Sequence, residues 1–215
     1  MNQIEYATEH DLTKIAKCHI AAFPNSLSSK MGYIFVSKML RWYLSDLNKF
    51  LFFVKEQNSV IGYCGGHLQD GLDGFGAASG MTQFGFSSAI TSLMLRPWLF
   101  FHPDFTTRYN FIFINILRKL SLKKDKPLAQ TNAIYFNQPL TAGLVVIGVI
   151  PNLQQKGLGT LLQQEFERKA IEMGALQLQL SVRIDNTKAI KSYQRNGYVI
   201  EKEVTPSYVM IKKLK

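Results

Sequence analysis

Two glycines follow a long apolar run within Thr141–Thr160, and their spacing suits phosphate binding. The run Leu144–Ile150 ends at Pro151, and Gly157 and Gly159 stand in the loop before a helix-patterned segment. An unbroken apolar run indicates a strand that is covered on both faces. Glycines let a ligand approach the backbone, and the first amides of a helix have no partners within it. With the helix dipole behind them, those amides suit a phosphate or pyrophosphate.

Two glycines before a helix also occur in simple tight turns. Their spacing here differs from the phosphate-loop pattern G-x-x-x-x-G-K-[ST] and from the dinucleotide pattern G-x-G-x-x-G in its strand–helix–strand setting. The stretch instead resembles the acetyl-CoA loop of the GNAT acetyltransferases, [QR]-x-x-G-x-[GA] after a strand that ends in V-x-P. The matching segments are Val149-Ile150-Pro151 and Gln154-Gln155-Lys156-Gly157-Leu158-Gly159.

A second pattern lies in the stretch Asn186–Tyr198. Its sequence, N-T-K-A-I-K-S-Y-Q-R-N-G-Y, resembles the second GNAT signature, N-x-x-A-x-x-x-Y-x-x-x-G-[FY]. The two signatures stand in the order and separation typical of the family, so the chain is identified as a GNAT member. This resemblance implies an α/β (α+β) fold with a mixed, mostly antiparallel central sheet flanked by helices.

The resemblance also implies direct transfer of acetyl from the cosubstrate acetyl-CoA to an amine, without a covalent enzyme intermediate or a metal. Such chemistry needs a neutral amine, a polarised thioester carbonyl and a proton for the departing thiolate. By resemblance Tyr193 donates that proton, although a helical tyrosine can also be a plain core residue, and a backbone N–H near Val149 polarises the carbonyl. The residues expected to bind the cosubstrate are Ile147, Val149, Ile150, Gln154, Gln155, Lys156, Gly157, Leu158, Gly159, Thr160, Asn186 and Tyr193.

The general base is not specified by the sequence. Many relatives carry a carboxylate early in the central strand, at the position that aligns with Gly143. His67 ends a predicted hairpin strand and needs little pKa tuning to act as a base near neutral pH, but it can equally be a rim residue. The other candidates are His19, Asp70, Asp73 and a chain of waters to bulk solvent.

The first predicted helix carries candidates for the acceptor site. Thr8 and Asp11 give it a start resembling a capping box, and Pro24 ends it. His19 lies on or beside its apolar face, where the alternative to an acceptor role is a buried histidine bonded to a carbonyl. The expected acceptor-site residues are His19, Phe23 and His67.

The remaining patterns predict the other elements of the domain. The predicted strands are Gln3–Ala7, Phe50–Lys55, Val60–His67, Leu144–Ile150, Leu176–Val182, Tyr198–Val204 and Tyr208–Leu214. The predicted helices are Leu12–Phe23, Tyr33–Leu44, Leu158–Met173 and one capped by Asp185 or Asn186, with a polar turn at Asn25–Lys30. Strict alternation of Leu176, Leu178, Leu180 and Val182 with polar residues indicates a half-buried strand.

A long insertion, about residues 68–140, separates the third and fourth predicted strands. Segments of this length are usually functional or disordered, and the many aromatics of Phe84–Phe113 disfavour disorder. One interpretation is a helical cap on the core. The other is a peripheral contact of 84–126 with a membrane or partner protein, because Thr106–Lys124 is amphipathic with a basic end. The basic residues could also bind a nucleic acid, but no recognised nucleic-acid-binding motif accompanies them, which disfavours a nucleic acid as the partner.

Composition bounds the class of protein. At 215 residues and 47% hydrophobic content, the chain predicts one domain, 1–215, that contains the insertion. A net charge of +10 attracts polyanions such as nucleotide-linked substrates. Cys18 and Cys64 show no metal or redox spacing and the N-terminal stretch is not an apolar signal segment, so a cytoplasmic location is expected, with peripheral membrane contact as an option.

These observations favour an N-acetyltransferase for the primary amine of a small-molecule acceptor. The insertion and the A-F-P-N-S element after the first helix resemble GNAT proteins associated with surface-polysaccharide assembly, which favours a nucleotide-linked amino sugar as acceptor. The alternatives are a non-catalytic acyl-CoA-binding module, a transferase for an amino acid or peptide amine, and a transferase with another acyl donor. The missing carboxylate at Gly143 keeps these alternatives open.

Overall fold

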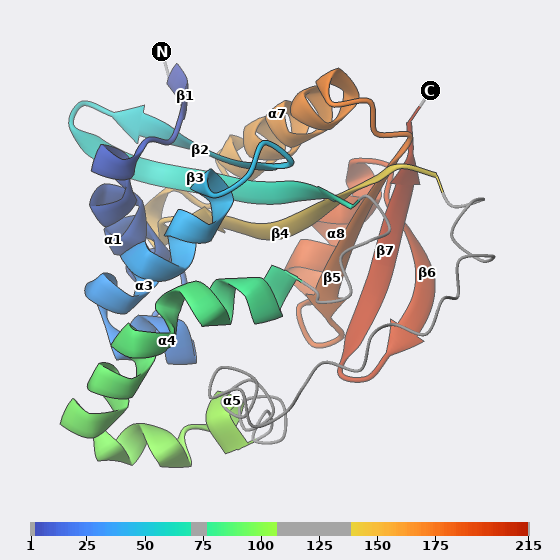
Figure 1. Ribbon diagram of the computed structural model, residues 1–215. Helices are drawn as coiled ribbons and strands as arrows, with labels where there is room; N and C mark the ends of the chain where they lie inside the picture. The colour runs from blue at the N-terminus through green and yellow to red at the C-terminus, as the bar shows by residue number, and fades with distance from the viewer. Residues whose placement is uncertain (1–2, 70–76, 107–138, 215) are drawn as a thin grey trace.

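The computed structural model describes residues 3–69, 77–106 and 139–214. Their strands form one seven-stranded sheet in the order β1-β2-β3-β4-β5-β7-β6 (Figure 1). Neighbouring strands pair antiparallel except β4 and β5, which are parallel. The strands are β1 (Gln3–Tyr6), β2 (Lys49–Glu56), β3 (Ser59–Gln69), β4 (Thr141–Val149), β5 (Gln177–Arg183), β6 (Val199–Val204) and β7 (Ser207–Lys213). The expected mixed, mostly antiparallel sheet is confirmed.

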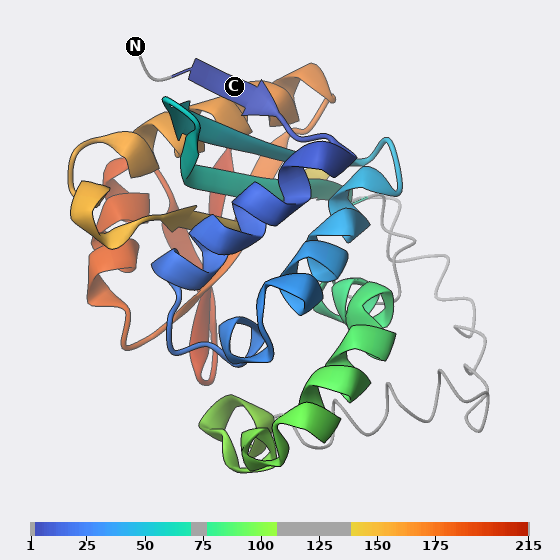
Figure 2. The same ribbon diagram turned by 90° about the vertical axis from the view of Figure 1, so that its left-hand side faces the viewer.

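Helices cover both faces of this sheet, so the domain has three layers (Figure 2). The α-helices are α1 (Leu12–Ala22), α2 (Leu27–Met31), α3 (Tyr33–Leu40), α4 (Ala77–Leu95), α5 (Pro103–Thr106), α7 (Leu158–Glu172) and α8 (Thr187–Arg195). Short 3-10 helices lie at η1 (Glu9–Asp11), η2 (Arg41–Leu44), η3 (Pro97–Phe101) and η5 (Pro151–Leu153). Buried residues of α1 and α3 form one core cluster, and those of α7 and α8 form the other.

Several predicted helix ends follow local rules. The Asp11 carboxylate accepts hydrogen bonds from the Thr8 backbone N–H at 3.0 Å and from its hydroxyl at 2.6 Å, so the expected capping interaction is present. Gly174 takes a φ of +84° just after α7, and Asn186 caps α8 through its side chain. These three predictions are confirmed.

The region between α1 and β2 differs from the predicted one. Asn25–Lys30 was expected to be a polar turn, but the Ser26 hydroxyl accepts a hydrogen bond from the Ser29 N–H and begins helix α2. Gly32, with a φ of +92°, then separates α2 from α3. The predicted second helix also ends early, because after Leu40 the chain tightens into the 3-10 turn η2.

The alternating pattern of the fifth strand is correct for three of its four apolar residues. Leu178, Leu180 and Val182 are buried in the cluster beneath α7. Leu176 is 61% exposed, so its predicted place on the buried face is wrong. It precedes β5, where its N–H donates to the Leu140 carbonyl, and it lies outside the core cluster.

The described part of the insertion packs on the α1–α3 side of the domain. Helix α4 approaches α3 so closely that a Cβ atom on Gly85 would lie 2.8 Å from the Phe35 ring. The predicted amphipathic helix at Thr106–Lys124 lies outside the described residues, apart from Thr106 at the end of α5. Within the described ranges, no helix combines the length and apolar character that crossing a membrane requires.

Candidate active site

Strand β4 leaves its neighbour β5 halfway along its length. β4 pairs with β5 only from Thr141 to Leu144, but it stays paired with β3 as far as Val149. Residues 145–149 therefore present one edge of N–H and C=O groups that has no strand partner among the described residues. An extended ligand that carries amide groups fits such an edge, as an added strand does.

A β-bulge explains this departure. Gly65 of β3 faces Val146, whereas the next residue, Gly66, faces Leu144. Val145 is therefore an extra residue in β4, and an extra residue bends the strand that carries it. The bend falls directly after Leu144, the last residue that pairs with β5.

The glycine loop lies beyond the far end of this open edge. Gly157 has a φ of +84° and stands as the N-cap of α7, whose Leu161 N–H donates to the Gly157 carbonyl at 3.0 Å. A Cβ atom at Gly157 or Gly159 would meet no atom within 4 Å. The N–H groups of residues 158–160 are the first of the helix and have no partners within it. Open space in front of these amides fits a pyrophosphate group.

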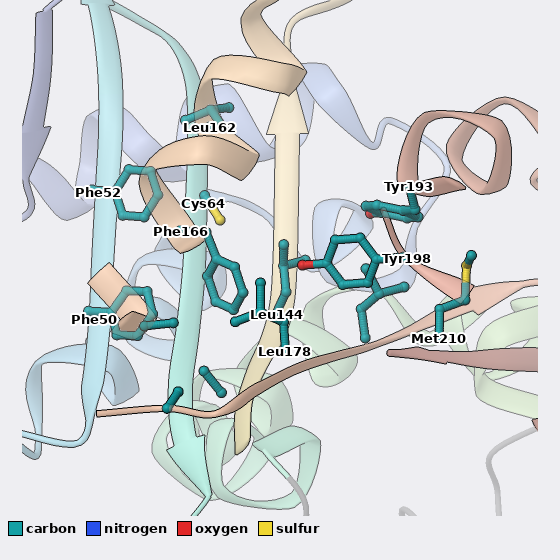
Figure 3. Packing of buried hydrophobic residues seen from close by; sticks show 14 of the residues in the cluster. Phe50, Phe52, Cys64, Leu144, Leu162, Phe166, Leu178, Tyr193, Tyr198 and Met210 are labelled. Atoms are coloured by element: carbon teal, nitrogen blue, oxygen red, sulfur yellow. The ribbon is translucent and has the colours of Figure 1, made fainter. Parts of the chain in front are cut away.

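Tyr193 of α8 lies in the core cluster under α7. Its side chain is 8% exposed, and its hydroxyl points toward β4 (Figure 3). Burial raises the pKa of the Tyr193 hydroxyl, and the nearby Cys64 thiol adds to the effect. The hydroxyl therefore stays protonated at neutral pH, which a general acid requires.

His67 lies on the opposite face of the sheet, beside Gly143. The two residues are register partners in β3 and β4. A Cβ atom on Gly143 would lie 2.9 Å from His67 Cε1 and 3.3 Å from Nδ1. The His67 side chain is buried, and Trp42 packs against its ring edge-on at a centroid distance of 5.6 Å. The imidazole thus covers the Gly143 position, where the family resemblance led us to expect a carboxylate.

The acetyltransferase (GNAT) family model matches residues 88–198, which hold the bulged strand, the glycine loop and both signatures. The chain belongs to this family. A comparison with curated proteins found no match.

Solved structures with low sequence identity share the GNAT fold of this chain. PaiA N-acetyltransferase from Thermoplasma acidophilum, in complex with coenzyme A, is 12% identical, with 100% of this chain and 99% of that one covered and a TM-score of 0.57. Chaetomium thermophilum Naa20 with a bisubstrate analogue is 20% identical, with coverage of 99% and 86% and a TM-score of 0.56. The ribosomal-protein-S18-alanine N-acetyltransferase from Escherichia coli is 17% identical, with coverage of 100% and 95% and a TM-score of 0.52.

The predicted cosubstrate residues of this GNAT chain fall into two groups. Gln155, Lys156 and Thr160 are exposed at the loop, whereas Ile147, Val149 and Ile150 are half-buried along or just after β4. Leu158 is buried in the core, so only its backbone can face a ligand.

Two other predicted cosubstrate residues have structural partners. The Gln154 side-chain amide donates to the Val149 carbonyl at 3.0 Å and ties the loop to the end of β4. The Asn186 side chain accepts from the Ala189 N–H at 3.2 Å, as a helix cap does. Both side chains therefore shape the GNAT site through the backbone that they hold.

His19 and Phe23 lie on the same face of the sheet as His67. The Phe23 ring approaches β4, since its Cε2 atom is 2.9 Å from the position of a Gly148 Cβ atom. His19 is bonded to the Tyr63 and Ser28 hydroxyls, so the alternative of a carbonyl partner is wrong. Burial lowers the pKa of His19 to about 4, and the ring is therefore neutral at physiological pH.

Tyr63 was missed as a residue of this face. Its ring also covers Gly148, with Cε1 at 2.7 Å from the position of a Cβ atom there. A period-two pattern along β3 places Tyr63, Gly65 and His67 on one face, and that signal was available in the sequence. The remaining base candidates, Asp70 and Asp73, lie outside the described residues.

Proposed function

We propose that this GNAT protein transfers acetyl from acetyl-CoA directly to the primary amine of a small acceptor. The observation that carries the proposal is the open edge of β4, residues 145–149, which leads to the glycine loop at the start of α7. The amide-containing arm of the cosubstrate fits along that edge. Its pyrophosphate fits at the free N–H groups of residues 158–160.

In the proposed reaction, the amine nitrogen bonds to the thioester carbon and the carbon–sulfur bond breaks. The Tyr193 hydroxyl supplies a proton to the departing sulfur. A backbone N–H near Val149 polarises the thioester carbonyl, where negative charge develops. The proton that the amine loses passes to a general base, so charge and atoms balance.

His67 is our proposed general base. Its imidazole lies beside Gly143, on the face that also carries His19 and Phe23. A neutral imidazole has a ring nitrogen that can accept a proton. The remaining candidate among the described residues, His19, is less suited to the role, because both of its ring nitrogens are bonded, to the Tyr63 and Ser28 hydroxyls.

For the acceptor, we propose a nucleotide-linked amino sugar. The net charge of +10 favours an anionic substrate. Helix α4 of the insertion packs against α3 and enlarges this side of the domain, where a larger acceptor could be bound. A peptide or protein amine is the second candidate, because one similar structure is named as a ribosomal-protein-S18-alanine N-acetyltransferase.

The described part of the insertion also supports the proposed peripheral contact. Several of its large apolar side chains, two of them aromatic, face solvent, and exposed apolar side chains favour an interface. They are Met94, Leu95, Trp98 and Phe101, whose exposed fractions are 78%, 73%, 63% and 85%.

The test is acetyl transfer to a panel of amines: nucleotide-linked amino sugars, free amino sugars, amino acids and short peptides. Thiol release from acetyl-CoA reports turnover, and calorimetry reports CoA affinity. Affinity for CoA with thiol release on one class of amine is the expected result. A protein that binds CoA but releases no thiol with any amine would favour the non-catalytic module. Release only with longer acyl donors would favour a different acyltransferase.

A further inference from the structure

Tyr198 carries a buried hydroxyl that the proposed mechanism does not use. Its side chain is 3% exposed, and its oxygen has no hydrogen-bond partner within the described parts of the chain. A buried hydroxyl without a partner is uncommon and costs free energy. Burial raises the pKa of this hydroxyl, so it remains a neutral donor at physiological pH.

The backbone holds Tyr198 next to Tyr193. Gly197, with a φ of +87°, follows α8 in the left-handed conformation that ends many helices. The Tyr198 N–H donates to the Tyr193 carbonyl at 3.1 Å, and the Gly197 N–H donates to the Gln194 carbonyl at 3.1 Å. This pattern of two bonds brings the tyrosine rings together, with centroids 5.7 Å apart and planes at 63°.

Both hydroxyls point toward β4 (Figure 3). The two tyrosines share the core cluster with Leu144 and Leu178, which lie where β4 and β5 are still paired. Cys64, the register partner of Ile147, is close enough to raise the pKa of both tyrosines. The Tyr198 hydroxyl therefore faces the strand whose open edge receives the acyl-carrying arm in the proposed function.

The second signature accepts phenylalanine or tyrosine at this position, so it assigns no role to the hydroxyl. We propose that Tyr198 binds the cosubstrate, its hydroxyl donating a hydrogen bond to a carbonyl oxygen of the acyl-pantetheine arm. This inference rests on the proposed function. The carbonyl belongs either to the thioester or to an amide of the arm, and the two sources can be separated because CoA has only the amides.

The experiment compares the wild-type protein with Tyr198→Phe by calorimetry, using acetyl-CoA and CoA separately. One hydrogen bond in a desolvated site corresponds to a loss of affinity of about threefold to tenfold. Equal losses for both ligands would assign the arm amide, and a loss for acetyl-CoA alone would assign the thioester carbonyl. Unchanged affinity for both ligands would overturn the inference. A wild-type protein that binds neither ligand would overturn the proposed function itself.

Tyr43 provides a matched control. It is 1% exposed and its hydroxyl also lacks a partner within the described ranges, but it packs on Gly65 on the opposite face of the sheet. Tyr43→Phe is expected to leave both affinities unchanged. An equal loss of affinity in Tyr43→Phe would mean that the effect does not depend on the site, and would also overturn the inference.

Thermal unfolding of the unliganded proteins separates binding from structure. Because the Tyr198 hydroxyl has no partner in the fold, its removal is expected to leave the midpoint of Tyr198→Phe unchanged or higher. Adding acetyl-CoA raises the midpoint of both proteins, and this rise is expected to be smaller for Tyr198→Phe than for the wild type. If Tyr198→Phe has a lower midpoint without ligand but the same rise on adding acetyl-CoA, the hydroxyl stabilises the fold and does not bind the ligand, and the inference is wrong.

Discussion

The imidazole of His67 occupies the space into which a side chain at position 143 would extend. The Cβ atom of such a side chain would lie 2.9 Å from His67 Cε1. Contacts this short require one group to move, and the two residues sit opposite each other in paired strands. A carboxylate at position 143 would therefore require the His67 imidazole to move from its present position.

This relationship gives the first prediction. His67→Ala is expected to lower kcat by about 10² to 10⁴, the usual contribution of acid–base catalysis. Gly143→Glu alone is expected to be damaging, because the new side chain meets the imidazole. The double variant His67→Ala with Gly143→Glu removes that clash and is expected to regain activity.

Steady-state kinetics against pH checks this prediction. Ordinary glutamate titrates about two pH units below histidine, so the acidic limb of the double variant's profile should move to lower pH. Activity of His67→Ala equal to that of the wild type, with chemistry limiting turnover, would remove His67 from the mechanism.

The second prediction concerns Tyr193. Tyr193→Phe removes one oxygen and little volume, so folding and CoA affinity are expected to survive. The value of kcat is expected to fall by about 10² to 10⁴ while KM for acetyl-CoA changes little. CoA is a fairly acidic thiol, with a pKa near the ~8.5 of cysteine, which places the loss at the low end. A kcat within a factor of about three of the wild type would make Tyr193 a core residue.

The third prediction separates helix stability from ligand binding at Gly159. No atom lies within 4 Å of a Cβ atom there, and the residue belongs to the first turn of α7. Gly159→Ala is expected to stabilise the unliganded protein by up to about 1 kcal/mol, because glycine is a poor helix former. CoA affinity is expected to fall in the same variant, and further in Gly159→Val.

Thermal unfolding and calorimetry measure these opposite effects. Position 157 is unsuitable for this test, because its φ of +84° would strain any side chain placed there. A folded Gly159→Val protein with unchanged CoA affinity would argue against the loop as the pyrophosphate site.

The fourth prediction concerns the insertion, which holds both ends of helix α2. The Asp104 carboxylate accepts from the Leu27 N–H at 3.2 Å, and Arg96 donates to the Lys30 carbonyl at 3.0 Å. An acid at the N-terminus and a base at the C-terminus also complement the helix dipole. A five-residue helix is not stable alone, so these contacts matter for α2.

We expect Arg96→Ala with Asp104→Ala to speed hydrogen exchange at Leu27–Met31 and to impair acceptor turnover. Affinity for CoA should be unchanged, because the bonds that these variants remove are made to α2 and not to the glycine loop. Arg195→Ala serves as a control, since Arg195 makes its side-chain bond within α8. Normal turnover despite faster exchange would show that the insertion does not shape the acceptor site.

The fifth prediction concerns pH and stability. Burial lowers the pKa of His19 from 6.5 to about 4 in the folded protein, so below pH 6.5 the unfolded chain binds more protons. The free energy of unfolding should therefore fall as the pH drops through this window, by about 2 kcal/mol between pH 7.5 and pH 5.

Denaturant unfolding at both pH values tests this contribution. His19→Asn is expected to be less stable at pH 7.5, because the bonds to Tyr63 and Ser28 change. Its loss of stability on acidification should be smaller than that of the wild type by about the same 2 kcal/mol. An equal pH dependence in the two proteins would show that His19 is not the responsible group.

Features that depend on neighbours in the chain were determined by the sequence alone. The capping bond between Thr8 and Asp11, the glycine that ends α7 and the Asn186 cap each involve residues within a few positions of one another. The two signatures likewise identify the family without any tertiary contact. Apolar runs and alternation identified the buried strands β2 to β5. The predicted strand β6 is present as well, although it is exposed along its whole length and is held by its pairing with β7.

Only the tertiary structure decided which side chains meet across the sheet. His67 lies beside Gly143 because of the register between β3 and β4, and one shifted residue would move it to the other face. His19 bonds Tyr63, 44 residues away, and the Tyr198 hydroxyl faces β4 because α8 docks beside that strand. These contacts depend on strand register and helix docking, which arise from many distant residues together and leave no short pattern in the sequence.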